Sequence, residues 1–133
     1  MDSNVQSIVR DCTTGSDDGR MTFPEVVMRL LQAGVESYHA DLRRAEKTYY
    51  LPNGDSLVVP SDAVAGDPAP TFGEAGVAAA IKAIQAGGMS YRQFCEAIVA
   101  AGCVGYLVSL AGRRAVYFGR TGDFHVEHFP TAK

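Results

Sequence analysis

The sequence predicts an α+β fold in which a helix–helix–strand–strand–strand unit occurs twice. We expect about six strands in one mostly antiparallel sheet, with the helices mainly on one face. Three observations predict this fold. Residues 21–58 resemble residues 89–126 without a gap; both segments carry the same series of helix signals; and alternating apolar and polar residues follow each series.

The similarity between the two segments exceeds chance. Nine positions are identical, where ordinary residue frequencies give roughly two or three. They are Met21/Met89, Ala33/Ala101, Gly34/Gly102, Tyr38/Tyr106, Leu42/Leu110, Tyr49/Tyr117, Gly54/Gly122, Asp55/Asp123 and Val58/Val126. We therefore expect a single domain over 1–133, built from two repeats (1–59 and 74–129) and joined by a proline-containing linker, 60–73.

Each half opens with two helices. Apolar residues at helical spacing predict a short amphipathic helix over 4–12, and a polar loop follows over 13–20. The next helix begins at Thr22, which forms a capping box with Glu25, and Gly34 supplies the left-handed position after its end. In the second half, the matching residues are Val77, Ala80, Ile81 and Ile84 for the first helix, and Ser90, Gln93 and Gly102 for the second.

Three strands follow in each half. They are expected over 36–42, 47–51 and 56–59, and again over 104–110, 115–119 and 124–129. Tyr38 and its counterpart Tyr106 lie on the face that should pack against the helices. The dipeptide Asn53-Gly54 predicts a two-residue type I′ hairpin turn between the last two strands of the first half.

Composition excludes several classes of protein. The chain has 133 residues, of which 47% are hydrophobic and 20% charged, which is typical of a globular domain rather than a disordered one. A net charge of −3 argues against a general binder of nucleic acid or of anionic membranes. We see no signal peptide and no membrane-spanning stretch, so we expect a cytoplasmic protein.

Cysteine usage predicts no disulfide framework and no metal site. Cys12, Cys95 and Cys103 are odd in number and show no CxxC spacing. We expect reduced, mostly buried thiols, as in a cytosolic protein. No set of three or four ligands has the spacing of a structural metal site, so we expect neither a metal nor a cofactor.

Two imidazole–carboxylate pairs are candidates for chemistry. His39 and Asp41 lie two apart on a predicted strand, where an imidazole oriented by a carboxylate can accept a proton near neutral pH. His125 and Glu127 form a similar pair, while His128 points to the other face, which makes a three-ligand metal site awkward. The simpler interpretation of both pairs is solvent-facing strand residues with no function.

Arginines at equivalent turns are candidates for holding an anion. Arg113 and Arg114 occupy the turn that corresponds to Arg43 and Arg44 in the first half. His39 occupies the position that Leu107 holds in the other half, so packing alone does not require a titratable group there. We therefore hypothesise a pocket around His39 and Asp41, with Arg113 or Arg114 as the anion contact.

The chain resembles the family called domain of unknown function 1398, small bacterial and prophage-encoded proteins that are sometimes labelled phage envelope protein. The resemblance covers nearly the whole chain. It is carried by 21–26, 33–41, 47–50, 101–106, 112–120 and 125–129. The family implies no established activity, so it supplies no catalytic residues.

These observations favour a non-enzymatic binding or assembly module that forms a homodimer. Leu107 falls on the sheet face opposite Tyr38 and Tyr106, and one or other face of the second strand carries Tyr50 and Phe118. A sheet with apolar groups on both faces needs a second layer, which a second copy would supply. The alternative is a small-molecule-binding protein or enzyme with a site around His39 and Asp41.

Overall fold

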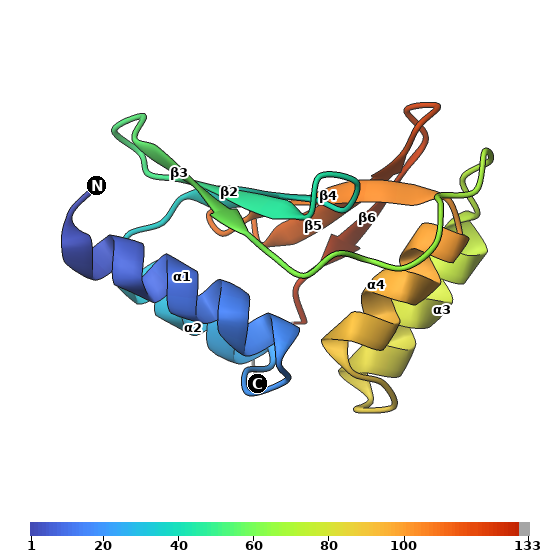
Figure 1. Cartoon of the computed structure of the whole chain (residues 1–133), viewed down its shortest axis with the longest axis horizontal. Helices are drawn as coiled ribbons and strands as arrows, with labels where there is room; N and C mark the ends of the chain where they lie inside the picture. The colour runs from blue at the N-terminus through green and yellow to red at the C-terminus, as the bar shows by residue number, and fades with distance from the viewer. Residues whose placement is uncertain (131–133) are drawn as a thin grey trace.

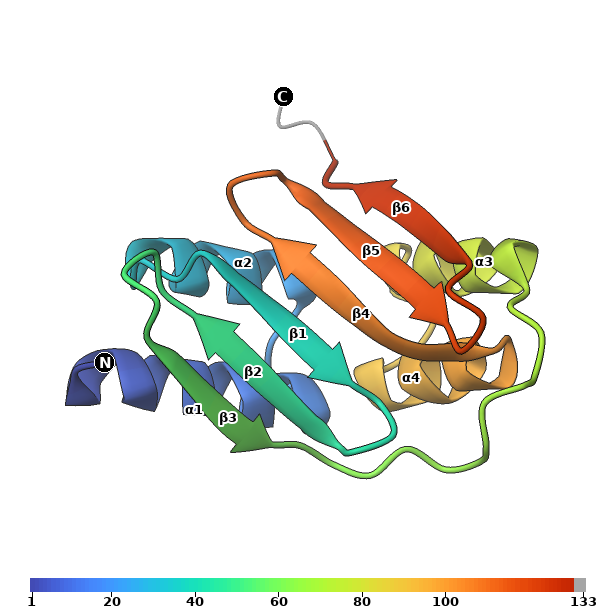
Figure 2. The same cartoon turned by 90° about the horizontal axis from the view of Figure 1, so that it is seen from above.

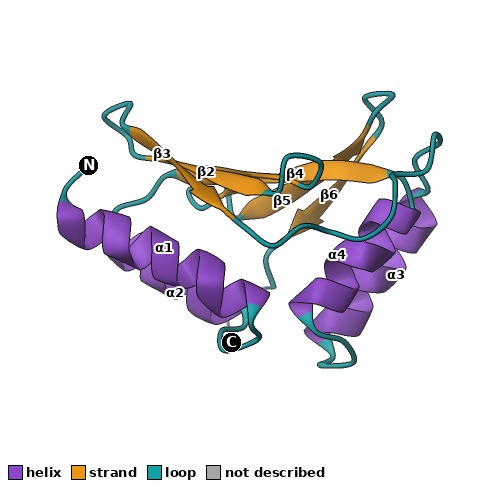
Figure 3. Cartoon of the chain, viewed as in Figure 1, coloured by secondary structure: helices purple, strands orange, loops and turns teal. Residues whose placement is uncertain are grey.

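Two similar series of elements make up the chain in the computed structural model, which describes residues 1–130 (Figure 3). Helices α1 (Ser3–Asp17) and α2 (Phe23–Gln32) precede strands β1 (Ser37–Asp41), β2 (Glu46–Tyr50) and β3 (Ser56–Pro60). Helices α3 (Glu74–Gln85) and α4 (Tyr91–Ala100) precede strands β4 (Cys103–Ser109), β5 (Arg114–Gly119) and β6 (Phe124–His128). The predicted α+β class is confirmed.

The helices cover one face of the sheet and leave the other open. Both helix pairs lie on the same side of the strands, α1 with α2 below one half and α3 with α4 below the other (Figure 1). Alternation along the strands agrees with this arrangement, because Tyr38 and Ala40 are buried while their neighbours on β1 are only partly covered. The prediction of helices mainly on one face is confirmed.

The strand order is β3-β2-β1-β4-β5-β6, and every neighbouring pair is antiparallel (Figure 2). Each half contributes three adjacent strands, and the halves meet where β1 pairs with β4. In that pairing His39 lies opposite Leu107, and Asp41 lies opposite Gly105. This register decides which side chains of the two halves can meet.

The caps of α2 and α4 follow the sequence signals. Thr22 with Glu25, and Ser90 with Gln93, form complete capping boxes. After the helices end, Gly34 adopts φ 82° and Gly102 adopts φ 98°, conformations that favour glycine.

The first helix is longer than predicted. It runs to Asp17, whereas a polar loop was expected from Thr13 onward. The Thr13 hydroxyl bonds to the carbonyl of Val9 and shares a 2.8 Å hydrogen bond with the Tyr49 hydroxyl. Tertiary contacts therefore hold this segment in a helix despite residues of low helical propensity.

The predicted type I′ turn at Asn53-Gly54 is wrong. The Gly54 amide donates to the carbonyl of Leu51, so Pro52 and Asn53 are the central residues of the turn. Proline fixes a negative φ at the first of these, and Asn53 is not among the residues with positive φ. Gly54 still needs its positive φ of 94°, but it follows the turn rather than forming its centre.

Tyrosines and thiols fill the layer between sheet and helices. Tyr38 and Tyr106 are 2% and 3% exposed, as predicted for core residues, and Tyr49 lies beside Tyr38. The three cysteines are free and buried, which confirms the expected burial of the thiols. No helix within residues 1–130 is both long enough and apolar enough to cross a membrane.

The linker between the halves packs against the helix side. The amides of Ala69 and Gly73 donate to the carbonyls of Val99 and Ala101 at the end of α4. Nearer its start, the Asp62 amide donates to the carboxylate of Asp17 on α1. The linker therefore touches both helix pairs on its way across the molecule.

Candidate functional site

The six residues predicted as a site lie in three separate places. His39, Asp41 and Arg114 lie on the open face, on β1 and β5. Arg113 lies in the turn before β5, and His125 and Glu127 lie on the helix-facing side of β6, because they pair with the buried Tyr117 and Ala115. The structure therefore does not gather them into one pocket.

His39 and Asp41 share a strand face but make different contacts. The ring of His39 stacks on Phe118, with 5.8 Å between ring centroids. The two rings meet above Gly105, where an added Cβ would lie 3.1 Å from Phe118 and 3.3 Å from the His39 ring. The Asp41 carboxylate instead accepts from the backbone amides of Arg43 and Arg44, so its contacts order the β1–β2 turn.

The arginines lie away from Asp41. Arg114 pairs with Ser109, which pairs with Ser37, so Arg114 belongs to the opposite end of the open face from Asp41. Its guanidinium donates to the carbonyl of Gly112. Arg113 adopts φ 53° and lies over the ring of Phe129, 5.8 Å from the ring centroid.

His125 lies between two carboxylates. Its Nδ1 is 2.7 Å from Glu74 at the start of α3, and its Nε2 is 3.2 Å from Glu127 on the same strand. Burial lowers the pKa of His125, but the hydrogen bonds to Glu74 and Glu127 outweigh it, so the pKa is raised. Within residues 1–130, no group of three or more His, Cys, Asp or Glu side chains is arranged to hold a metal ion.

His125 should make stability depend on pH near neutrality. Because its folded pKa is raised, its contribution is present below the ordinary histidine pKa and is lost as pH rises through the folded value. We expect His125→Gln to destabilise the protein at about pH 6, by less than about 1 kcal/mol since Glu74 is exposed, and to have little effect at about pH 9. Urea unfolding at both pH values measures this, with His128→Gln as the control; equal losses at both would contradict it.

The open face carries a contiguous apolar patch on β4, β5 and β6. We call it the β4–β6 patch; its members are Leu107, Val116, Phe118, Phe124 and Val126. Leu107, Val116 and Val126 form one cross-strand row, and Phe118 pairs with Phe124 in the next. Leu107 is 40% exposed and Phe124 60%. Apolar side chains gathered in adjacent exposed rows make this patch a candidate interaction surface.

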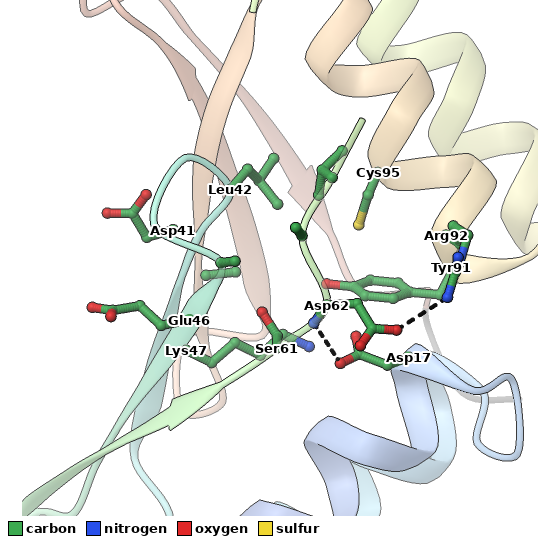
Figure 4. A pocket seen from close by; sticks show the side chains of 14 residues that line it. Asp17, Asp41, Leu42, Glu46, Lys47, Ser61, Asp62, Tyr91, Arg92 and Cys95 are labelled. Atoms are coloured by element: carbon green, nitrogen blue, oxygen red, sulfur yellow. Dashed lines mark hydrogen bonds and ion pairs between the residues drawn. The ribbon is translucent and has the colours of Figure 1, made fainter. Parts of the chain in front are cut away.

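A small cavity lies on the helix side, where β1 ends and β2 begins (Figure 4). Its lining comes from α1 (Asp17), β2 (Lys47), the linker (Ser61, Asp62) and α4 (Tyr91). The volume is about 20 Å³, which is room for about one water molecule. Asp41 and Glu46 point away from the cavity in Figure 4, so its chemistry comes from the other side chains.

Lys47 is the unusual residue of this cavity, because it is a lysine with only 3% of its surface exposed. Its Nζ lies 4.6 Å from the ring centroid of Tyr91 and 5.8 Å from that of Tyr38. Burial lowers the pKa of Lys47, and Asp17 partly opposes this. Burial likewise raises the pKa of Asp17. The amine of Lys47 and the carboxyl of Asp17 therefore favour their neutral forms more than the same groups would at the protein surface.

Sequence reasoning missed Lys47, although a signal was present. Strand alternation places Lys47 on the same face as Tyr49, a position that is also tyrosine, Tyr117, in the other half. At the position of Lys47 the other half carries Ala115, an ordinary core residue. A lysine at a core position is rare enough to single out.

Comparison with known proteins now places the chain in a family. The sequence pattern of the family described as protein of unknown function (DUF1398) matches residues 22–127. The chain belongs to this family. The resemblance found in the sequence is therefore confirmed, and the matched segment of the DUF1398 chain includes both Lys47 and the β4–β6 patch.

Relatives of this DUF1398 chain occur in mycobacteria. Uncharacterized proteins of Mycobacterium bovis and of two strains of Mycobacterium tuberculosis are each 34% identical to it over 110 residues. The match covers 80% of this chain and 66% of each relative, so it spans slightly less than two thirds of their length.

Proposed function

We propose that this chain is a non-enzymatic assembly module that pairs with a second copy of itself through the open face of its sheet. The observation that carries the proposal is the β4–β6 patch. A sheet with apolar groups on both faces needs a second layer, and the four helices supply it on one face only.

The size of the open face fits a second copy. Six strands about 4.8 Å apart, each with at least five residues at about 3.3 Å, give a projected area of at least roughly 480 Å². That projection is more than half of the roughly 800 Å² that each partner buries in a standard interface, and side-chain relief adds to it. A twofold axis through the patch would place Leu107 and Val116 of both copies against each other.

His39 takes a supporting part in this proposal. Its ring extends the aromatic surface of Phe118 at the border of the β4–β6 patch. An imidazole at the rim of an apolar interface supplies a polar contact without a permanent charge. The free, buried thiols support a reducing compartment such as the cytoplasm.

The dimer predicts a specific effect of charge on the patch. We expect the parent chain to sediment as a dimer at tens of micromolar, and Leu107→Lys to weaken the association at least about tenfold because a charge would be buried in the interface. Analytical ultracentrifugation over a concentration series measures both chains.

Met28→Lys is the matched control, because Met28 is a more exposed apolar residue, at 62%, on α2 rather than on the open face. It should leave the association constant unchanged. The open face is ruled out as the dimer interface if the parent chain stays monomeric at tens of micromolar. It is also ruled out if Met28→Lys weakens the association as much as Leu107→Lys does.

A further inference from the structure

Lys47 is a buried residue whose amine has no hydrogen-bond or ion-pair partner among residues 1–130. Among residues 1–130, no hydrogen bond and no ion pair within 4.0 Å involves its Nζ, and its close neighbours are the rings of Tyr91 and Tyr38. Every fully enclosed side-chain nitrogen or oxygen in those residues does have a partner. The amine therefore reaches the open space of the cavity, and Figure 4 shows it directed there.

An arginine stands at the rim of the same cavity. The Arg92 guanidinium donates to the Asp62 carboxylate at 3.1 Å, but both side chains are largely exposed, at 68% and 57%. Exposed ion pairs of this kind add little to stability, so a competing carboxylate can replace Asp62. Arginine is also well shaped to bind a carboxylate with two parallel hydrogen bonds.

We propose that Lys47 is a reactive amine that forms an imine with a small 2-oxo acid whose carboxylate binds Arg92. The two contacts define the ligand class: a carbonyl group for the amine inside the cavity, and a carboxylate for the guanidinium at its rim. A cavity with room for about one water molecule admits a carbonyl group but not a large substituent, so the smallest 2-oxo acids fit best.

The step needs no oxidant, reductant or metal. The lone pair of the neutral amine attacks the carbonyl carbon, a nitrogen–carbon bond forms, and a proton moves from nitrogen to oxygen to give a carbinolamine. The hydroxyl then takes a proton and the carbon–oxygen bond breaks, so that water leaves and a protonated imine remains. Loss of the second nitrogen proton gives the imine. Asp17 lines the same cavity as Lys47 and is the carboxylate that we assign to accept and return these protons.

Reductive trapping with glyoxylate tests the proposal on the intact chain. Cyanoborohydride reduces an imine to a stable secondary amine, and peptide mass mapping locates the carboxymethyl group that results. The lysines are Lys47, Lys82 and Lys133, of which Lys82 is exposed on α3. We expect Lys47 to be labelled at least about tenfold faster than Lys82, because more of it is neutral at pH 7.

Variants separate the amine from the carboxylate contact. Lys82→Arg should leave labelling of Lys47 unchanged, and unfolding in guanidinium should abolish the difference between the two lysines. Arg92→Met should slow labelling by glyoxylate but not by acetaldehyde, which has no carboxylate. If Lys82 is labelled faster than Lys47, labelling follows solvent exposure, and the proposal that Lys47 is a reactive amine is wrong. If glyoxylate labels Lys47 at the same rate in Arg92→Met and in the parent, the proposal that Arg92 binds the carboxylate of a 2-oxo acid is wrong.

Discussion

Gly102→Ala should destabilise the protein by about 2–5 kcal/mol, the largest effect that we expect from a single methyl group. Gly102 follows α4 with φ 98°, a conformation that costs an alanine about 1–2 kcal/mol. An added Cβ would also lie 2.3 Å from the carbonyl oxygen of Thr71 and 3.0 Å from the Cα of Phe72. These are backbone atoms, so the linker itself would have to move, which adds about 1–3 kcal/mol.

Gly34→Ala provides the matched control. Gly34 follows α2 with a similar φ of 82°, but an added Cβ would meet nothing within 4 Å. We expect a loss of only about 1–2 kcal/mol there, from the backbone conformation alone. Urea unfolding of both variants gives the comparison. Equal losses at the two glycines would show that the linker does not pack tightly against the end of α4.

Lys47→Met should stabilise the protein by about 1–4 kcal/mol at pH 7, as is found when buried charged groups are replaced by apolar ones of similar size. The ammonium loses its hydration on folding, and the tyrosine rings and Asp17 only partly replace it. Methionine is flexible enough to fill the same space. Lys82→Met, on the exposed side of α3, should change little.

The gain from Lys47→Met should shrink as pH rises. Because burial lowers the folded pKa of Lys47, the unfolded chain binds more protons than the folded one between the folded and the ordinary lysine pKa. The parent therefore gains stability with pH across that window, and the variant does not. Thermal or urea unfolding from neutral to about pH 10 measures this. A variant less stable than the parent at pH 7 would mean that Lys47 makes net favourable contacts there.

Local signals were sufficient for most of the fold. The capping boxes at Thr22 and Ser90, and the glycines after α2 and α4, depend on neighbouring residues, and all are as predicted. The end of α1 was not predictable in this way, because Thr13 is held by Tyr49, a residue far along the chain. The hairpin turn was misjudged because Pro52 precedes Asn53 and fixes the turn one residue earlier.

The candidate sites were less predictable than the fold. His39, Asp41 and Arg114 do share the open face, but the β1–β4 register separates Arg114 from Asp41, and register was not predicted. The contact between His125 and Glu127 follows from strand alternation, while the contact with Glu74 needs the packing of α3 on β6. Lys47 was not predicted as a site residue because lysine is ordinarily a surface residue, and its burial depends on the packing of α1, α4 and the linker over β2.

The strand order also has a consequence for how quickly the chain can fold. Four of the five strand pairs join neighbours in sequence; only β1 with β4 joins residues far apart. Each half can therefore form its meander through short loops, and the slow event is the meeting of the two meanders. Loop closure depends only logarithmically on length, so a few extra residues at Gly66 should slow refolding in stopped flow only slightly.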